Sequence, residues 1–242
     1  MNRYFLQAGA WTDNILTITG EEAHHATRVM RVKENDQIEI FDGQGKSAVC
    51  TITQATRTAL ECTIENTRTQ TRPEHPIKLC QAIPKGGNME LIVQKAVELG
   101  VHSIQPLITT HTVARPEATT KKQTKWQRFA VEACKQCGQN YLPEIKQPLA
   151  FSQWIDTKTE AESRFVAALD PKASHFKKCL AQHPVTGQVE LLIGPEGDFS
   201  PEEYQQAYSA GFIPVSLGDI VLRVETATLF ALSVLQYELS AC

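Results

Sequence analysis

The strongest constraint on the fold is a change of hydrophobic pattern at residues 71–76. This segment is polar and contains Pro73 and Pro76, which is typical of a linker. Before it, short runs with alternating hydrophobicity predict four strands, at residues 15–18, 37–41, 48–52 and 60–64. After it, apolar runs alternate with helical patterns, which is typical of an α/β domain. We therefore predict two domains, comprising residues 1–72 and 73–242.

The first region is expected to form a small β-barrel-like module. Residues 42–45, with the sequence Asp-Gly-Gln-Gly, separate two of its strands and predict a hairpin turn. One helical stretch, residues 20–30, carries Arg28 and is followed by Lys33. We place Arg28 and Arg31 on one face of that helix. Such cations usually belong to a solvated face, and they become phosphate contacts if the partner is RNA.

The second region alternates buried strands with helices, which predicts a largely parallel sheet. The expected strands comprise residues 77–83, 104–108, 165–169, 189–193 and 213–217. The expected helices comprise residues 89–99, 124–138, 201–211 and 229–239. A basic stretch lies on or just before the second of these helices and contains Lys121, Lys122, Lys125 and Arg128. It is usually a solvated face, and it becomes a set of phosphate contacts if the partner is RNA.

Composition narrows the class of protein. The chain is 42% hydrophobic and 21% charged, so a sizeable core can form. A net charge of -3 does not indicate a general nucleic-acid binder, although a local basic patch can serve that role. No apolar run approaches the roughly 18 residues of a membrane span. The first residues also lack the apolar stretch of a signal peptide, so we expect a cytoplasmic protein without a membrane partner.

Two residue pairs could indicate a metal, and we expect neither to bind one. Cys134 and Cys137 form a C-x-x-C, but no second pair follows at zinc-site spacing. The helical pattern around them favours two free thiols. His24 and His25 are adjacent, and neighbouring side chains on a helix point about 100° apart, so they do not converge.

A glycine-containing loop links a predicted buried strand to a helix start. After residue 193 the chain reads Gly194, Pro195, Glu196, Gly197, Asp198. Ser200, Pro201 and Glu203 then give an N-cap, a first helical proline and a capping box. Such a loop lets a ligand approach the backbone, unless it is only a tight turn. Pro195 removes an amide donor and Glu196 adds an anion, which disfavours a phosphate and favours a cationic centre or an adenine edge.

The next segment brings a charged pair to a helix start. Gly218 ends the strand at residues 213–217, and Arg223 and Glu225 precede the apolar helix, with Thr226 as the candidate N-cap. A charged pair that enters an apolar helix needs a partner or a ligand. The alternative is a local Arg–Glu ion pair that anchors the turn.

These motifs together resemble the SPOUT superfamily of methyltransferases, and more closely its ribosomal RNA small subunit methyltransferase E family. The resembling segments comprise residues 20–32, 85–100, 132–138, 193–197, 217–218 and 222–227, in the family's order. The chain departs from the family at Asp198, where a second glycine is usual. It also departs at Asp219 and Ile220, where a basic residue is common, and at Gln139, where an arginine is common.

The resemblance implies a fold and an activity. The fold is an N-terminal PUA-like RNA-binding β-barrel followed by an α/β domain with a trefoil knot, which forms a homodimer. The activity is methyl transfer from S-adenosylmethionine (SAM) to N3 of a specific uridine of 16S rRNA, within an assembled 30S subunit. Two alternatives stay open: a non-catalytic RNA-binding or ribosome assembly factor of the same fold, and a methyltransferase that acts on a different RNA base.

The resemblance also implies roles for particular residues. The expected cofactor-binding residues are Leu169, Ile193, Gly194, Pro195, Glu196, Gly197, Leu217, Gly218, Leu222 and Thr226. Arg223 is the candidate for stabilising charge on the deprotonated uracil, and Glu225 either orients Arg223 or takes the proton. The expected RNA-binding residues are Arg28, Arg31, Lys33, Lys85 and Arg128. A side chain at Gly194, Gly197 or Gly218 is expected to intrude on the ligand.

Overall fold

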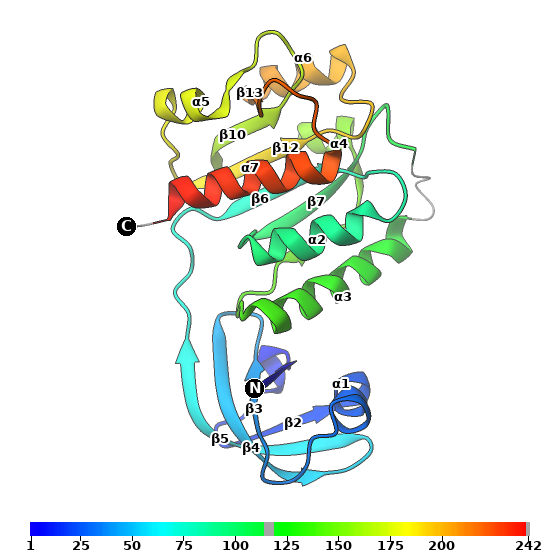
Figure 1. Cartoon of the computed structure of the whole chain (residues 1–242), viewed down its shortest axis with the longest axis vertical. Coiled ribbons are helices and arrows are strands. Elements are labelled where there is room, and N and C mark those ends of the chain that lie inside the picture. The colour runs from blue at the N-terminus through cyan, green and yellow to red at the C-terminus, as the bar shows by residue number, and fades with distance from the viewer. Residues whose placement is uncertain (114–118, 241–242) are drawn as a thin grey trace. The chain divides into compact units, whose positions relative to one another are not determined.

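The computed structural model describes residues 1–113 and 119–240 and divides into two compact units (Figure 1). The first unit contains Met1–Arg72 and Cys134–Leu142, and the second contains Pro73–Ala133 and the chain from Pro143 onward. Residues 134–142, which the sequence analysis assigned to the second domain, therefore belong by their contacts to the first unit.

The first unit is built on a five-stranded sheet. Its strands are β1 (Asn2–Phe5), β2 (Ile15–Thr19), β3 (Gln37–Phe41), β4 (Lys46–Ala55) and β5 (Ala59–Thr69). The order is β1-β3-β4-β5-β2, with β1 and β3 parallel and the other neighbours antiparallel. Within the described residues the two outer strands, β1 and β2, are not paired with each other. A short helical turn, η1 (Ala8–Ala10), follows β1.

The hairpin predicted at residues 42–45 is confirmed. The Asp42 carboxylate accepts hydrogen bonds from the backbone N–H groups of Gln44 and Lys46, at 2.7 and 3.0 Å. Gly43 and Gly45 have φ values of 76° and 105°, a region that favours glycine. The aspartate thus fixes the turn between β3 and β4.

The helix predicted at residues 20–30 is shorter and less regular than expected. It consists of α1 (Gly20–His24) and a wider π-helical turn, η2 (His25–Val29). Arg31 lies beyond the helix with φ of 54°, the left-handed conformation that commonly ends a helix. This bend lets Val32 turn into the core of the unit. The prediction that Arg28 and Arg31 share one helix face is therefore wrong, although both side chains are exposed.

The second unit contains an eight-stranded sheet in which every pair is parallel. Its strands are β6 (Ile77–Ala82), β7 (Ser103–Ile108), β8 (Glu144–Ile145), β9 (Leu149–Ala150), β10 (Ala161–Ala167), β11 (Ser174–His175), β12 (Gln188–Ile193) and β13 (Ile213–Ser216). The order is β11-β13-β10-β12-β6-β7-β8, and β9 pairs with β7. The predicted parallel α/β architecture is confirmed.

Helices cover both faces of this sheet (Figure 1). They are α2 (Asn88–Glu98), α3 (Thr119–Cys137), α4 (Phe151–Ile155), α5 (Phe176–Gln182), α6 (Pro201–Ser209) and α7 (Val224–Leu239). α7 packs on α2 and β12, and its buried Thr228 hydroxyl donates to the Gln81 side chain of β6 at 2.7 Å. On the opposite face, α4 and α6 bury an aromatic cluster against Cys80 and Leu192.

Cys134 and Cys137 both lie on α3, as predicted, with Cys134 buried and Cys137 exposed. Burial raises the pKa of the Cys134 thiol to about 12, so this thiol stays protonated near neutral pH. No group of three or more His, Cys, Asp or Glu side chains within the described residues could hold a metal ion. Cys242 lies outside the described residues.

None of the helices in the described parts of the chain is long and apolar enough to cross a membrane.

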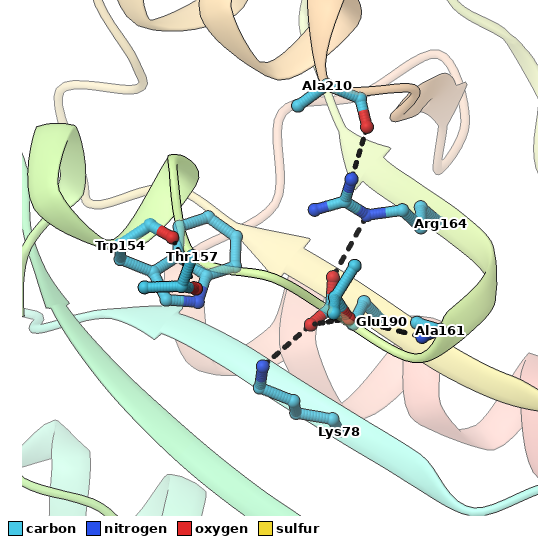
Figure 2. A network of polar contacts seen from close by, with 8 residues as sticks. Lys78, Trp154, Thr157, Ala161, Arg164, Glu190 and Ala210 are labelled. Atoms are coloured by element: carbon cyan, nitrogen blue, oxygen red, sulfur yellow. Dashed lines mark hydrogen bonds and ion pairs between the residues drawn. The ribbon is translucent and has the colours of Figure 1, made fainter.

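A buried charge network joins three adjacent strands of the sheet (Figure 2). Glu190 of β12 is 1% exposed, and it faces Lys78 of β6 and Arg164 of β10 in the strand register. Its carboxylate accepts hydrogen bonds from Lys78 at 2.6 Å, Arg164 at 3.0 Å and Thr159 at 2.9 Å. Arg164 also donates to the Ala210 carbonyl at the end of α6. The network therefore ties β6, β12 and β10 to one another and to α6.

We expect Glu190→Gln to destabilise the second unit strongly, because it leaves two largely buried cations without their counter-charge. Removing one partner of a buried ion pair costs about 3–5 kcal/mol. Urea denaturation should show this loss, whereas Glu160→Gln, which removes an exposed carboxylate, should change stability by less than about 0.5 kcal/mol. Equal stability of the two variants would mean that Glu190 contributes little.

Candidate functional site

A cavity of about 490 Å³ lies in the second unit, at the carboxyl ends of β10, β12 and β13. The loops that follow these strands line it, together with the start of α7 and Asn88 at the start of α2. Ligands of open parallel sheets bind at this edge, in the crevice outside the strand ends. The volume lies within the roughly 300–1,000 Å³ usual for small-molecule sites.

Most of the predicted cofactor and catalytic residues come together in this cavity. The predicted residues that line it are Leu169, Ile193, Gly194, Pro195, Glu196, Leu217, Gly218, Leu222, Arg223 and Glu225. Gly197 and Thr226 do not line it. The lining residues that the sequence analysis did not assign are Asn88, Ala167, Ala168, Asp198, Ser216, Ile220, Val221, Val224 and Ala227. Asp198 could have been found from its place inside the glycine loop, but no local signal pointed to Asn88.

The loop after β12 ends in the capping box that its sequence predicts. The Ser200 hydroxyl accepts from the Glu203 backbone N–H at 3.2 Å, and the Glu203 carboxylate accepts from the Ser200 N–H at 2.9 Å. Within the loop, the Asp198 N–H donates to the Pro195 carbonyl at 3.0 Å. The start of α6 therefore fixes one end of the cavity wall.

Glu203 also binds the loop after β7, which the sequence did not indicate. Its second carboxylate oxygen accepts from the Thr110 N–H at 2.8 Å, and the side chain is almost fully buried. In the same loop, the His111 ring nitrogen Nδ1 lies 2.9 Å from the Asp198 carbonyl oxygen. A carbonyl only accepts, so Nδ1 carries the proton in this contact. The loop after β7 is thus fastened to the cavity loop.

The protein atoms around the three glycines of the site show what a side chain would meet there. A Cβ on Gly194 would lie 3.1 Å from the Asp198 carboxylate and the Phe199 ring. A Cβ on Gly197 would lie 3.0 Å from His111, outside the cavity lining. Gly218 has no neighbour within 4 Å of such an atom, but its φ of 130° favours glycine. Close side-chain neighbours thus favour glycine at the first two positions, and backbone conformation favours it at the third.

Two tyrosines of α6 form hydrogen bonds with aspartates in the loops that line the cavity. Asp198 Oδ1 accepts from the Tyr204 hydroxyl at 2.7 Å and from the Phe199 N–H at 2.9 Å. Burial, and then this bond to Asp198, raise the pKa of Tyr204. Tyr208 stacks on Tyr204 and donates to the Asp170 carboxylate, in the loop after β10, at 2.8 Å. α6 therefore connects the loops that follow β10 and β12.

α7 begins earlier than predicted. Its first residue is Val224, so Arg223 is the N-cap residue and Thr226 lies inside the first turn. The reason is that Val224 and Thr228, four residues apart, are both buried and extend the inner face of the helix. Glu225 suits the first turn because the helix dipole favours an acid there.

Arg223 and Glu225 do not form the local ion pair that was the alternative interpretation. Glu225 instead accepts from the Asn88 amide at 3.3 Å, and no salt bridge of Arg223 occurs among the described residues. Arg223 is exposed at the cavity, where its guanidinium can meet a ligand.

The candidate RNA-binding residues fall in both units. Arg28, Arg31 and Lys33 are exposed side chains of the first unit. Lys85 is exposed in the loop after β6, and its N–H donates to the cavity residue Glu196 at 2.9 Å. Arg128 is exposed on α3 and does not line the cavity. The structure thus places Lys85 beside the cavity residues, and Arg128 of the same unit is not among the lining residues.

We expect Tyr204→Phe to lower the free energy of unfolding by about 1–3 kcal/mol, because Asp198 loses a hydrogen bond to a charged group. The difference from the unmodified chain should shrink above pH 10.0, the ordinary tyrosine pKa. There the unfolded phenol ionises while the folded one, with its raised pKa, stays protonated, so alkali removes the stability that Tyr204 contributes, and only the chain that retains Tyr204 has this contribution to lose. Urea denaturation near neutral pH and above pH 10.0 tests both points.

Tyr237→Phe is the matched control, because it keeps the aromatic ring and removes a hydroxyl that makes no hydrogen bond among the described residues. It should behave like the unmodified chain at both pH values. A pH-independent effect of Tyr204→Phe would contradict the assigned cause of the raised pKa.

Comparison with known proteins defines the class. Residues 71–236 match the model of an RNA methyltransferase domain, and residues 18–65 match that of an RNA methyltransferase PUA domain. The fold and the cavity therefore belong to an RNA methyltransferase with a PUA domain.

Individual relatives define the family. Ribosomal RNA small subunit methyltransferase E of Buchnera aphidicola subsp. Schizaphis graminum is 32% identical, over 97% of this chain and 93% of that protein. The enzyme of that name from Neisseria gonorrhoeae, solved bound to SAM, is 29% identical with a TM-score of 0.89, over 98% and 97% of the two chains. A protein assigned as a methyltransferase from Legionella pneumophila, solved with the cofactor SAM, is 34% identical with a TM-score of 0.87, over 97% and 96%. The chain belongs to the ribosomal RNA small subunit methyltransferase E family.

Proposed function

We propose that this protein uses SAM to methylate N3 of a specific uridine in 16S rRNA, acting in the cytoplasm on an assembled 30S subunit. The observation that carries the proposal is the cavity at the ends of β10, β12 and β13, where the family motifs at residues 193–197 and 222–227 meet. Two structures that resemble this chain over nearly its whole length hold SAM.

The lining of the cavity fits SAM. Apolar side chains such as Leu169, Leu217 and Leu222 suit the adenosine, and the backbone of the glycine loop is accessible for hydrogen bonds. Carboxylates predominate over cations in the lining, which suits a positively charged ligand and disfavours a phosphate. The chemistry that SAM supplies when bound is a methyl group activated on a cationic sulfur. Gly197 and Thr226 act, in this proposal, by shaping the loop and the helix start.

Arg223 is proposed to stabilise the uracil as it loses the N3 proton. Deprotonation places negative charge on the carbonyl oxygens beside N3, and a preorganised cation lowers the energy of that state. The N-cap position holds the Arg223 backbone at the start of a rigid helix, while its side chain is free of an intramolecular ion pair among the described residues. The protein also aligns the methyl donor with the acceptor nitrogen.

Glu225 is proposed to take the N3 proton. Its two candidate roles were to orient Arg223 or to act as the base, and its bond to Asn88 rather than to Arg223 favours the second. Because the Asn88 amide only donates to it, the carboxylate keeps acceptor capacity for a proton.

The RNA is proposed to bind through the exposed cations Arg28, Arg31 and Lys33 of the PUA domain, and through Lys85 and Arg128 of the methyltransferase domain. Contacts to phosphates need no particular secondary structure, so the left-handed conformation of Arg31 does not remove it from this set. Lys85 is the candidate nearest the chemistry, because its backbone bonds to Glu196 of the cavity.

The chain is also proposed to contain the trefoil knot of its superfamily and to form a homodimer. In support of the knot, the segment after β13 returns past β10 and β12 to place α7 on α2. In support of the dimer, α7 exposes Phe230 and Tyr237, seven residues apart and so on one helix face, and α2 exposes Leu91. A second copy would cover these side chains.

Two measurements test the function directly. Calorimetric titration should show SAM binding to the purified protein, and small subunits that lack the modification should gain one methyl group at uridine N3. If the folded protein does not bind SAM, it would instead be a non-catalytic RNA-binding or assembly factor. Binding of SAM without methylation of 16S rRNA would indicate a different RNA base.

We expect Arg223→Ala to lower turnover on small subunits by about 10²–10³, as for loss of one donor that stabilises developing charge. Cofactor affinity should change much less. Arg223→Lys should retain only part of the rate, because the lysine ammonium cannot donate the two parallel hydrogen bonds of a planar guanidinium. The melting temperature of each variant is the control. A destabilised variant with normal activity below its melting temperature would make Arg223 a structural residue.

We expect Tyr237→Glu combined with Phe230→Glu to convert the protein from a dimer to a monomer of 26.9 kDa, because charges would be buried in the interface. Light scattering measures the mass. Ile15→Glu, at an exposed apolar residue of the first unit, is the matched control and should leave the dimer intact. A monomeric unmodified chain would contradict the proposal.

A further inference from the structure

The cavity carries an excess of negative charge. Its ionisable lining residues are three carboxylates, Glu196, Asp198 and Glu225, and one guanidinium, Arg223. Among the described residues no salt bridge joins Arg223 to any of these acids. The negative charge is therefore not balanced by the protein, and a positively charged ligand would balance it.

Asp198 is the acid whose position is fixed most firmly. Its backbone has φ of 58°, a conformation that glycine adopts freely and that residues with a Cβ adopt at a cost. The bonds from Tyr204 and Phe199 to Oδ1 offset that cost and set the orientation of the side chain.

The second oxygen of Asp198 remains available. No hydrogen bond in the described parts of the chain involves Oδ2, and this atom is not among the buried polar atoms that lack a partner. Asp198 therefore presents a fixed negative charge in the wall of the cavity.

We propose that Asp198 makes this site distinguish the cationic methyl donor from its neutral product. The inference rests on the proposed function, in which the ligand is SAM. On transfer, the bond between the methyl carbon and sulfur breaks, a bond from that carbon to N3 forms, and the electron pair stays on sulfur. The N3 proton goes to Glu225. The sulfonium thereby becomes an uncharged thioether, S-adenosylhomocysteine, which a carboxylate in a partly desolvated cavity no longer holds.

This charge has a catalytic consequence at the end of each cycle. A site that bound donor and product equally would be inhibited as product accumulates, because the two molecules share every group except the methyl. Asp198 weakens the competition of S-adenosylhomocysteine with SAM for the site. It acts through the charge on sulfur and needs no contact that depends on the size of the methyl group. It is thus a specificity-determining residue rather than a group that takes part in bond making.

Asparagine is the substitution that removes the charge with least other change. Its amide has the shape of the carboxylate, it tolerates the left-handed conformation, and its oxygen can still accept from Tyr204. Glycine is the second variant, because it removes the side chain and relieves the backbone. Glu202→Gln is the control, since Glu202 is an exposed acid at the start of α6 that does not line the cavity.

The test is calorimetric titration of the full chain and the three variants with SAM, S-adenosylhomocysteine and sinefungin. Sinefungin carries an amine in place of the methylated sulfur, so it is cationic and unreactive. In Asp198→Asn and Asp198→Gly, affinity for SAM and sinefungin should fall about tenfold relative to affinity for S-adenosylhomocysteine, the order expected for removing one nearby charge. Glu202→Gln should leave the three affinities in their original ratio.

An equal change for all three ligands, in a variant with an unchanged melting temperature, would overturn the inference and leave Asp198 a shaping residue only. The failure of the proposed function looks different, because the unmodified chain would then bind none of the three. Steady-state kinetics supply a second readout. The inhibition constant of S-adenosylhomocysteine relative to the KM for SAM should fall in Asp198→Asn and stay unchanged in Glu202→Gln.

Discussion

The buried carboxylate of Glu190 is the interaction on which the arrangement of the catalytic sheet depends. It sits between Lys78 and Arg164 on the neighbouring strands, so one charge fixes the relative register of β6, β12 and β10. Such a charge is tolerated inside a protein only when it is paired and hydrogen-bonded, and Thr159 supplies a further bond. The network lies within the strands, and the loops at their carboxyl ends form the cavity.

Polar contacts between loops hold the cavity, in addition to the apolar cluster that Phe199 and Ala168 join. Tyr204 and Tyr208 connect the loops after β12 and β10, Glu203 adds the loop after β7, and Asn88 connects α2 to Glu225. Each of these contacts is directional, so small changes of loop position break it.

The sequence predicted those features that depend on neighbouring residues. The hairpin at Asp42, the capping box at Ser200 and the positions of the main strands along the chain follow from local patterns, and all are confirmed. The sequence could not show contacts between distant segments, such as Glu190 with Lys78 or Asn88 with Glu225. It also placed the start of α7 too late, because Val224 and Thr228 are recognisable as one buried face only when the packing is known.

The two bonds of the Glu203 carboxylate couple the stability of two separate loops. One oxygen completes the cap of its own helix, and the other holds the Thr110 amide of the loop after β7. Opening either loop leaves a nearly buried charge with a lost partner, so the free energies of opening are not independent. In hydrogen exchange, the amides of Thr110 and Ser200 would therefore be expected to open as one cooperative group although they lie on different loops. The cap of a short helix thus couples the loop after β7 to the loop after β12, which lines the cavity.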